Sequence, residues 1–151
     1  MKILKLGNIT IEADEVRTRK FYEKQSGFTC KCSDCTNYVS KVPYIQTLLN
    51  GIDIELGIDL SRDVGQGMDE LIPHDYEGYH LYLIPYYVIG GCYHNGEELD
   101  KEQSGPIWSS TRRAEYKLTD DLSLLVINTS GDIEMDTAEN VLTIWFEFKA
   151  S

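Results

Sequence analysis

The sequence lacks any long apolar run. No stretch of about 18 apolar residues, the length of a membrane-spanning helix, occurs in its 151 residues. The N-terminal segment also lacks the apolar stretch of a signal peptide, so we expect a cytoplasmic protein whose four cysteines stay reduced. No internal repeat or low-complexity segment is visible, which argues against a solenoid and against a disordered chain. Without a Pro-, Gly- or Ser-rich linker, residues 1–151 are expected to form a single domain.

Basic residues are scarce. The chain has 14 Lys and Arg against 25 Asp and Glu, which gives a formal net charge of -11. Such an acidic chain repels nucleic acid phosphates and anionic lipid headgroups. We therefore expect no nucleic acid partner and no membrane partner, and any charged partner is expected to be basic.

Familiar catalytic motifs are also missing. The sequence has no G-x-S-x-G nucleophile elbow, and Gly65 and Gly67 are not followed by the rest of a phosphate-binding loop. These absences favour a binding protein over an enzyme. A thiol-dependent enzyme remains an alternative, because a cysteine and a histidine can pair in space without a sequence motif.

Helix patterns occupy the first third of the chain and strand patterns the second half. We expect helices over about 14–26, 34–41 and 43–56. Pro43 separates the last two, because proline disfavours a helical conformation in the residue before it. Strand patterns dominate residues 79–149. This segregation predicts an α+β fold, with the helices packed on an antiparallel sheet or small β-sandwich.

The last strand pattern alternates. One face carries apolar residues, namely Leu142, Ile144, Phe146 and Phe148. The other face is more polar and consists of Thr143, Trp145, Glu147 and Lys149. The apolar face predicts contact with the core. Trp145, on the polar face, is expected either to lie under a loop or to anchor an interface with a partner.

Three cysteines, Cys30, Cys32 and Cys35, lie within six residues. Thiolates are soft ligands that suit zinc, and Cys32-x-x-Cys35 has the spacing of a zinc ligand pair. A structural zinc site needs four ligands. We expect Cys92 or His94 to supply the fourth if the strand that carries them passes nearby.

Two other interpretations of the cysteines stay open. Free cysteines commonly behave as small buried apolar residues, and these four can do the same. Alternatively, Cys32 and Cys35 form a redox pair at the start of a helix. In that helix we expect Ser33 or Asp34 to be the N-cap. Cys35 then lies in the first turn, where backbone amides stabilise a thiolate.

A stretch between Asp53 and Glu77 is strongly acidic and contains one basic residue, Arg62. Its acidic residues are Asp53, Glu55, Asp59, Asp63, Asp69, Glu70, Asp75 and Glu77. Their order does not match a calcium-binding loop. The stretch is either a docking face for a basic protein partner or a solvated surface that keeps the protein soluble.

The motif Gly27-Phe28-x-Cys30-x-Cys32-x-x-Cys35-x-Asn37-Tyr38 resembles a group of small acidic bacterial proteins. The resemblance covers about residues 20–95. It implies a bacterial cytosolic protein and no particular activity. Together with the charge, it favours a non-enzymatic protein-binding domain, such as an immunity or antitoxin-like protein that neutralises a basic toxin. A zinc-stabilised structural module is the main alternative.

Overall fold

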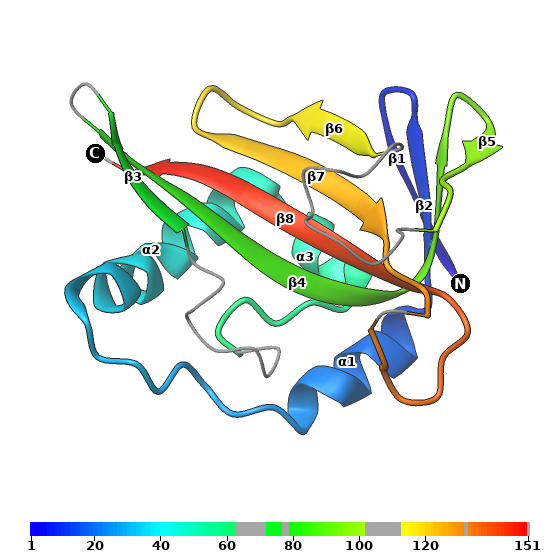
Figure 1. Cartoon of the computed structure of the whole chain (residues 1–151), viewed down its shortest axis with the longest axis horizontal. Coiled ribbons are helices and arrows are strands. Elements are labelled where there is room, and N and C mark those ends of the chain that lie inside the picture. The colour runs from blue at the N-terminus through cyan, green and yellow to red at the C-terminus, as the bar shows by residue number, and fades with distance from the viewer. Residues whose placement is uncertain (63–71, 77–78, 102–112, 132, 151) are drawn as a thin grey trace.

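The computed structural model of the chain describes residues 1–62, 72–76, 79–101, 113–131 and 133–150 (Figure 1). The helices in these residues are α1 (Glu15–Glu23), α2 (Ser33–Leu49) and α3 (Ile52–Leu56). The strands are β1 (Lys2–Leu6), β2 (Ile9–Ala13), β3 (Ile72–Tyr76), β4 (Tyr79–His94), β5 (Glu97–Glu98), β6 (Ala114–Lys117), β7 (Leu122–Asn128) and β8 (Val141–Ala150). Among the described residues, no helix has both the length and the apolar character needed to cross a membrane.

The strands form an antiparallel sheet in the order β1-β2-β4-β8-β7-β6, with β3 and β5 also paired to β4. Within β4, residues 80–89 pair with β8 and residues 90–94 pair with β2. The predicted antiparallel sheet from residues 79–149 is therefore confirmed. β1, β2 and β3 extend it beyond the predicted range.

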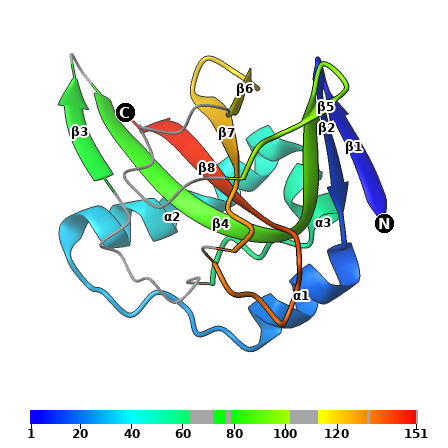
Figure 2. The ribbon, with the colours of Figure 1, turned by 45° about the vertical axis from the view of Figure 1, so that its right-hand side comes forward.

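β4 changes partners at Gly90, and Figures 1 and 2 show it curving from the β3 end of the sheet toward β5. Gly90 has a φ of +156°, and a Cβ at this position would collide with the backbone of Glu12 and Ala13. Glycine therefore allows β2 to approach β4 closely at the bend. A strand rises about 3.3 Å per residue, so the 16 residues of β4 keep its two ends far apart, which matters for the cysteines discussed below.

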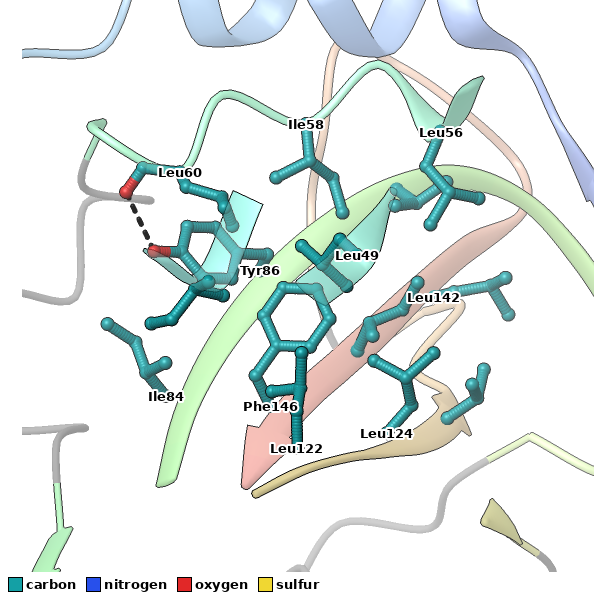
Figure 3. Close-up of a cluster of buried hydrophobic side chains, with 14 of the residues drawn as sticks. Leu49, Leu56, Ile58, Leu60, Ile84, Tyr86, Leu122, Leu124, Leu142 and Phe146 are labelled. Atoms are coloured by element: carbon teal, nitrogen blue, oxygen red, sulfur yellow. Dashed lines mark hydrogen bonds between the residues drawn. The ribbon is translucent and has the colours of Figure 1, made fainter. Parts of the chain in front are cut away.

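α2 and α3 lie on one face of the sheet and enclose an apolar core with it (Figures 1 and 3). Alternate residues of three strands supply the sheet side of this core: Tyr82, Ile84, Tyr86, Val88, Leu122, Leu124, Val126, Leu142, Ile144, Phe146 and Phe148. Tyr38, Ile45 and Leu49 of α2 are fully buried against them. The predicted α+β class is thus confirmed, as is the inward face of the last strand.

α1 docks on β4 through polar side chains. The hydroxyl of Tyr22 donates to the Tyr87 carbonyl at 2.9 Å and accepts from the Tyr87 amide at 2.8 Å. The Ile89 amide donates to Thr18 Oγ1 at 3.0 Å, and the Asp14 amide donates to the Ile89 carbonyl at 2.8 Å. Neither β3 nor β2 pairs with residues 84–89 of β4. The bonds from α1 therefore satisfy the backbone groups of Tyr87 and Ile89 on the side of β4 that faces away from β8. The predicted helix 14–26 therefore exists, but it ends earlier and is partly buried.

The predicted break at Pro43 is wrong, because α2 runs unbroken through it. Pro43 lies on the exposed side of the helix, where water can satisfy the carbonyl that loses its bond to the missing amide. The buried stripe continues across the proline through Val42 and Ile45 and favours one helix. The chain instead leaves α2 at Asn50, which has a φ of +51°. The predicted helix 43–56 is therefore divided between α2 and α3.

Candidate metal site

Three thiols meet at the start of α2. The Sγ atoms of Cys30, Cys32 and Cys35 all lie within 4.8 Å of one another, and those of Cys32 and Cys35 are 2.9 Å apart. None of the three forms a disulfide. Cys30 and Cys32 are exposed, whereas Cys35 is 2% exposed. Three soft ligand atoms this close together can hold a metal ion. We call this group the thiol cluster.

Cys32 is the N-cap of α2, in place of the expected Ser33 or Asp34. Its backbone is extended, with φ -64° and ψ 165°, and its carbonyl accepts the first helical bond, from Thr36, at 2.9 Å. Its sulfur accepts from the Cys35 amide at 3.4 Å, as a capping side chain does. Because Cys32 caps the helix, its sulfur lies over the first turn, next to Cys35.

Two contacts hold the segment that carries Cys30 in place. Residues 24–32, all of which are described, form no helix or regular strand. The Phe28 ring meets the buried Tyr38 ring edge to face, with 5.9 Å between centroids. Gly27 forms an isolated antiparallel bridge with Arg62. These contacts direct residues 28–32 toward the start of α2 and explain how an irregular segment brings Cys30 to the cluster.

The two sulfurs of the C-x-x-C pair differ in acidity. Hydrogen bonds from the Cys35 thiol, the Cys35 amide and Cys30 lower the pKa of the exposed Cys32. Burial raises the pKa of Cys35 well above the ordinary thiol range, and its bonds to Cys32 and Cys30 act in the same direction. The sequence suggested that the helix amides would stabilise a Cys35 thiolate. The structure reverses these roles, because Cys35 is buried and the capping position belongs to Cys32.

Cys92 and His94 do not join the thiol cluster. They lie at the far end of β4, where Cys92 pairs with Ile11 and His94 with Ile9, and Figure 1 places this end opposite the start of α2. Among the described residues, the group that could hold a metal ion consists of the three clustered cysteines. Cys92 is fully buried in the apolar core, and burial raises its pKa to about 12. The position of Cys92 and His94 at the far end of β4 thus excludes the expected fourth ligand, and Cys92 fits the interpretation of a buried apolar residue.

The proposed acidic docking face is only partly described. Asp63, Asp69, Glu70 and Glu77 lie outside the described residues, and the backbone of Asp75 lies in β3. Glu55 is exposed. Asp59 forms an ion pair with Arg62, with 3.6 Å between Asp59 Oδ2 and Arg62 Nε. Asp53 is 4% exposed, and burial raises its pKa. Its inward position in the first turn of α3 removes it from any exposed docking face.

Trp145 is buried rather than partly exposed. It lies on the outer face of the sheet, away from α2 and α3, between Pro85 of β4 and Leu125 of β7. The residue is 9% exposed, and its indole Nε1 is buried without a hydrogen-bond partner among the described residues. Trp145 is therefore not a surface anchor, and of the two expectations for it the covered position agrees with the structure.

The outer face of the sheet also carries a hollow that the sequence analysis missed. It has a volume of about 390 Å³, and Leu83, Lys117, Leu125 and Glu147 are among the residues that line it. The sequence does hold a trace of this surface, because Leu125 and Ile127 are apolar on the face of β7 opposite its core residues. A strand that is apolar on both faces indicates that its second face is also partly covered.

Comparisons of the chain with protein-family models, with curated proteins and with solved structures found no match. The function of the thiol cluster therefore has to be inferred from its own geometry and chemistry. Its distinguishing property is the convergence of three thiols from one short, anchored segment, two of them open to solvent.

Proposed function

We propose that this protein binds one zinc ion through Cys30, Cys32 and Cys35, and that the ion stabilises the fold around the start of α2. The observation that supports this most directly is the convergence of the three Sγ atoms within 4.8 Å. Zinc binds thiolates at about 2.3 Å, so sulfurs at the corners of a tetrahedron stand about 3.8 Å apart. Small side-chain rotations suffice to reach that geometry.

The charge at the start of α2 also suits the ion. Three thiolates around a divalent ion carry a net negative charge, which the positive end of the helix dipole favours. Binding must displace the thiol protons, including that of Cys35, whose pKa is raised. Zinc affinity is therefore expected to rise with pH, because the ion competes with protons for the three sulfurs.

The ligand set leaves one tetrahedral position open, since no described residue adds a fourth ligand. A water molecule, or a side chain outside the described residues or from another molecule, takes that position. Bound in this way, the ion would tie Cys30, on the irregular segment before α2, to Cys32 and Cys35 on the helix. This cross-link supports a structural role, because residues 24–32 lack regular secondary structure.

Metal content tests the proposal. The full chain is purified without chelator, and zinc is measured by atomic emission against protein concentration. We expect about one zinc per chain, a ratio near zero for Cys32→Ser, and an unchanged ratio for Cys92→Ala. Cys92→Ala is the matched control, since it removes a buried thiol outside the cluster. A ratio well below one in the wild-type protein, even after zinc is added, contradicts the proposal.

The net charge of -11 supports a second function, docking to a basic protein partner as in an immunity or antitoxin-like protein. Opposite charges on two partners accelerate their association, and salt weakens this attraction. The immobilised protein is exposed to a bacterial lysate at low and at high salt. We expect a basic protein to be retained at low salt, released at high salt, and held less by Glu55→Lys, which reverses an exposed charge. No basic protein retained at low salt contradicts this function.

A further inference from the structure

Two of the three clustered sulfurs are poised to bond to each other. The Sγ atoms of Cys32 and Cys35 are 2.9 Å apart, and a disulfide requires about 2.05 Å. The backbone on both sides is already fixed. Cys32 caps α2 through its bond to Thr36, and Cys35 is buried in the first turn. Closing the remaining gap therefore needs side-chain rotation and no unfolding of the helix.

The exposure of the pair differs between its members. Cys32 is exposed and open to a small oxidant, whereas Cys35 is 2% exposed and is shielded from one. This is the arrangement of an attacking thiol with a resolving thiol beneath it. Cys30 is also exposed, but it lies before the helix on the irregular segment. Cys32 and Cys35 are therefore the pair whose separation the helix itself holds short.

We propose that Cys32 and Cys35 form a reversible disulfide under peroxide, and that this oxidation releases the metal ion. The thiol pair is thus an oxidation site that regulates the zinc site. The regulatory part rests on the proposed zinc binding, while formation of the disulfide does not.

The chemistry balances in two steps. The Cys32 sulfur attacks one oxygen of hydrogen peroxide, the O–O bond breaks, and Cys32 becomes a sulfenic acid while the second oxygen leaves as water. The Cys35 sulfur then attacks the Cys32 sulfur, the S–O bond breaks, and the oxygen leaves with the Cys35 proton as a second water. In sum, two thiols lose two electrons and two protons to one peroxide. A dithiol reductant reverses the bond by thiol–disulfide exchange.

The disulfide is incompatible with the three-cysteine zinc site. It removes two of the three ligands and leaves Cys30 alone, and one thiolate does not provide the ligands that a zinc site needs. Bound zinc in turn occupies the same sulfurs and slows their oxidation without preventing it. Oxidation and zinc binding are therefore mutually exclusive states of the cluster.

The test begins with the reduced, metal-free full chain. It is treated with hydrogen peroxide, denatured, alkylated and analysed by mass spectrometry with peptide mapping. We expect two of the four cysteines to escape alkylation, a bridge between Cys32 and Cys35, and recovery of both thiols after dithiothreitol. Cys30→Ser should still form the bridge. Cys32→Ser should not, and because Cys32 is exposed this variant is expected to fold. Circular dichroism verifies the fold of each variant.

The same treatment is then applied to the zinc-loaded protein, and a chromogenic chelator reports the released ion. Release of zinc in step with the bridge supports the inference. A protein that holds zinc but forms no Cys32–Cys35 bridge overturns it and leaves the proposed zinc site standing. A protein that forms the bridge yet holds no zinc when reduced overturns the regulatory claim together with the zinc site. A bridge through Cys30 in the wild-type chain also overturns the inference.

Discussion

The cysteines near the two ends of β4 have different surroundings. Near one end, at the start of α2, Cys32 and Cys35 contact each other and Cys30. At the other end, Cys92 is enclosed by apolar residues without a second thiol nearby. Both Cys35 and Cys92 are buried and both have a raised pKa, yet Cys35 alone is within reach of other thiols. Whether a buried cysteine can bind metal or form a disulfide therefore depends on neighbouring thiols rather than on its burial.

Removal of metal should show the largest difference between the thiol cluster and Cys92. A structural zinc ion contributes directly to the free energy of folding. We expect a chelator to lower the melting temperature of the zinc-loaded protein by several degrees. Cys92→Ala should show a similar shift, and Cys32→Ser should show none. Scanning calorimetry measures the shift. Equal melting curves with and without chelator for the wild-type protein would contradict a structural metal ion at the thiol cluster.

Alkylation of the native, metal-free protein sharpens the comparison. Cys32 is exposed and its pKa is lowered, so it keeps a reactive thiolate at a lower pH than an ordinary thiol, whereas Cys92 reacts only after local opening. We expect iodoacetamide to label Cys32 at least about a hundred times faster than Cys92. The pH midpoint for Cys32 should lie below that of a free thiol at about 8.5. A midpoint at or above that value would show that the capping sulfur is not stabilised as a thiolate.

Serine substitutions at Cys32 and Cys92 should differ in their effect on the free energy of unfolding. Cys92→Ser places a hydroxyl in an apolar setting without a partner and should cost about 1–3 kcal/mol. Cys32→Ser replaces one exposed N-cap by another and should change the stability of the metal-free protein by no more than about 0.5 kcal/mol. Urea unfolding of the reduced chain measures both. A larger loss for Cys32→Ser than for Cys92→Ser would contradict the assigned environments.

The pH dependence of stability should show the smallest effect. The thiol of Cys92 keeps its proton in the folded protein up to about pH 12, whereas the unfolded chain loses it from about pH 8.5 upward. The unfolded state then binds fewer protons than the native state, so the free energy of unfolding falls as pH rises. Each such thiol contributes at most about 1.4 kcal/mol per pH unit. Between about pH 9 and 10, Cys92→Ala should have a shallower decline than the wild-type protein in urea unfolding, and an equal decline would count against a neutral buried thiol.

Local patterns in the sequence predicted much of this molecule. The alternation of Leu142, Ile144 and Phe146 identified the inward face of the last strand, and the clustering of thiols identified the candidate metal site. What the sequence did not give depended on tertiary context. The buried stripe of α2 overrode Pro43, and the pairing of the far end of β4 with β2 places Cys92 away from the cluster. Neither effect is visible without knowing which elements pack together.

The roles of the two helix-start thiols were also set by tertiary context. Sequence spacing placed Cys35 near backbone amides, but the burial of its side chain raises its pKa. Capping rules favoured Ser33 or Asp34, yet Cys32 occupies the capping position, and Phe28 before it packs against Tyr38.

X-ray absorption at the zinc edge tests the central claim most directly, because it counts the atoms bound to the ion. The zinc-loaded full chain should show about three sulfur neighbours at about 2.3 Å and one lighter neighbour, and Cys92→Ala should give the same spectrum. A first shell of nitrogen and oxygen alone, or one unchanged in Cys32→Ser, would contradict zinc binding by the thiol cluster.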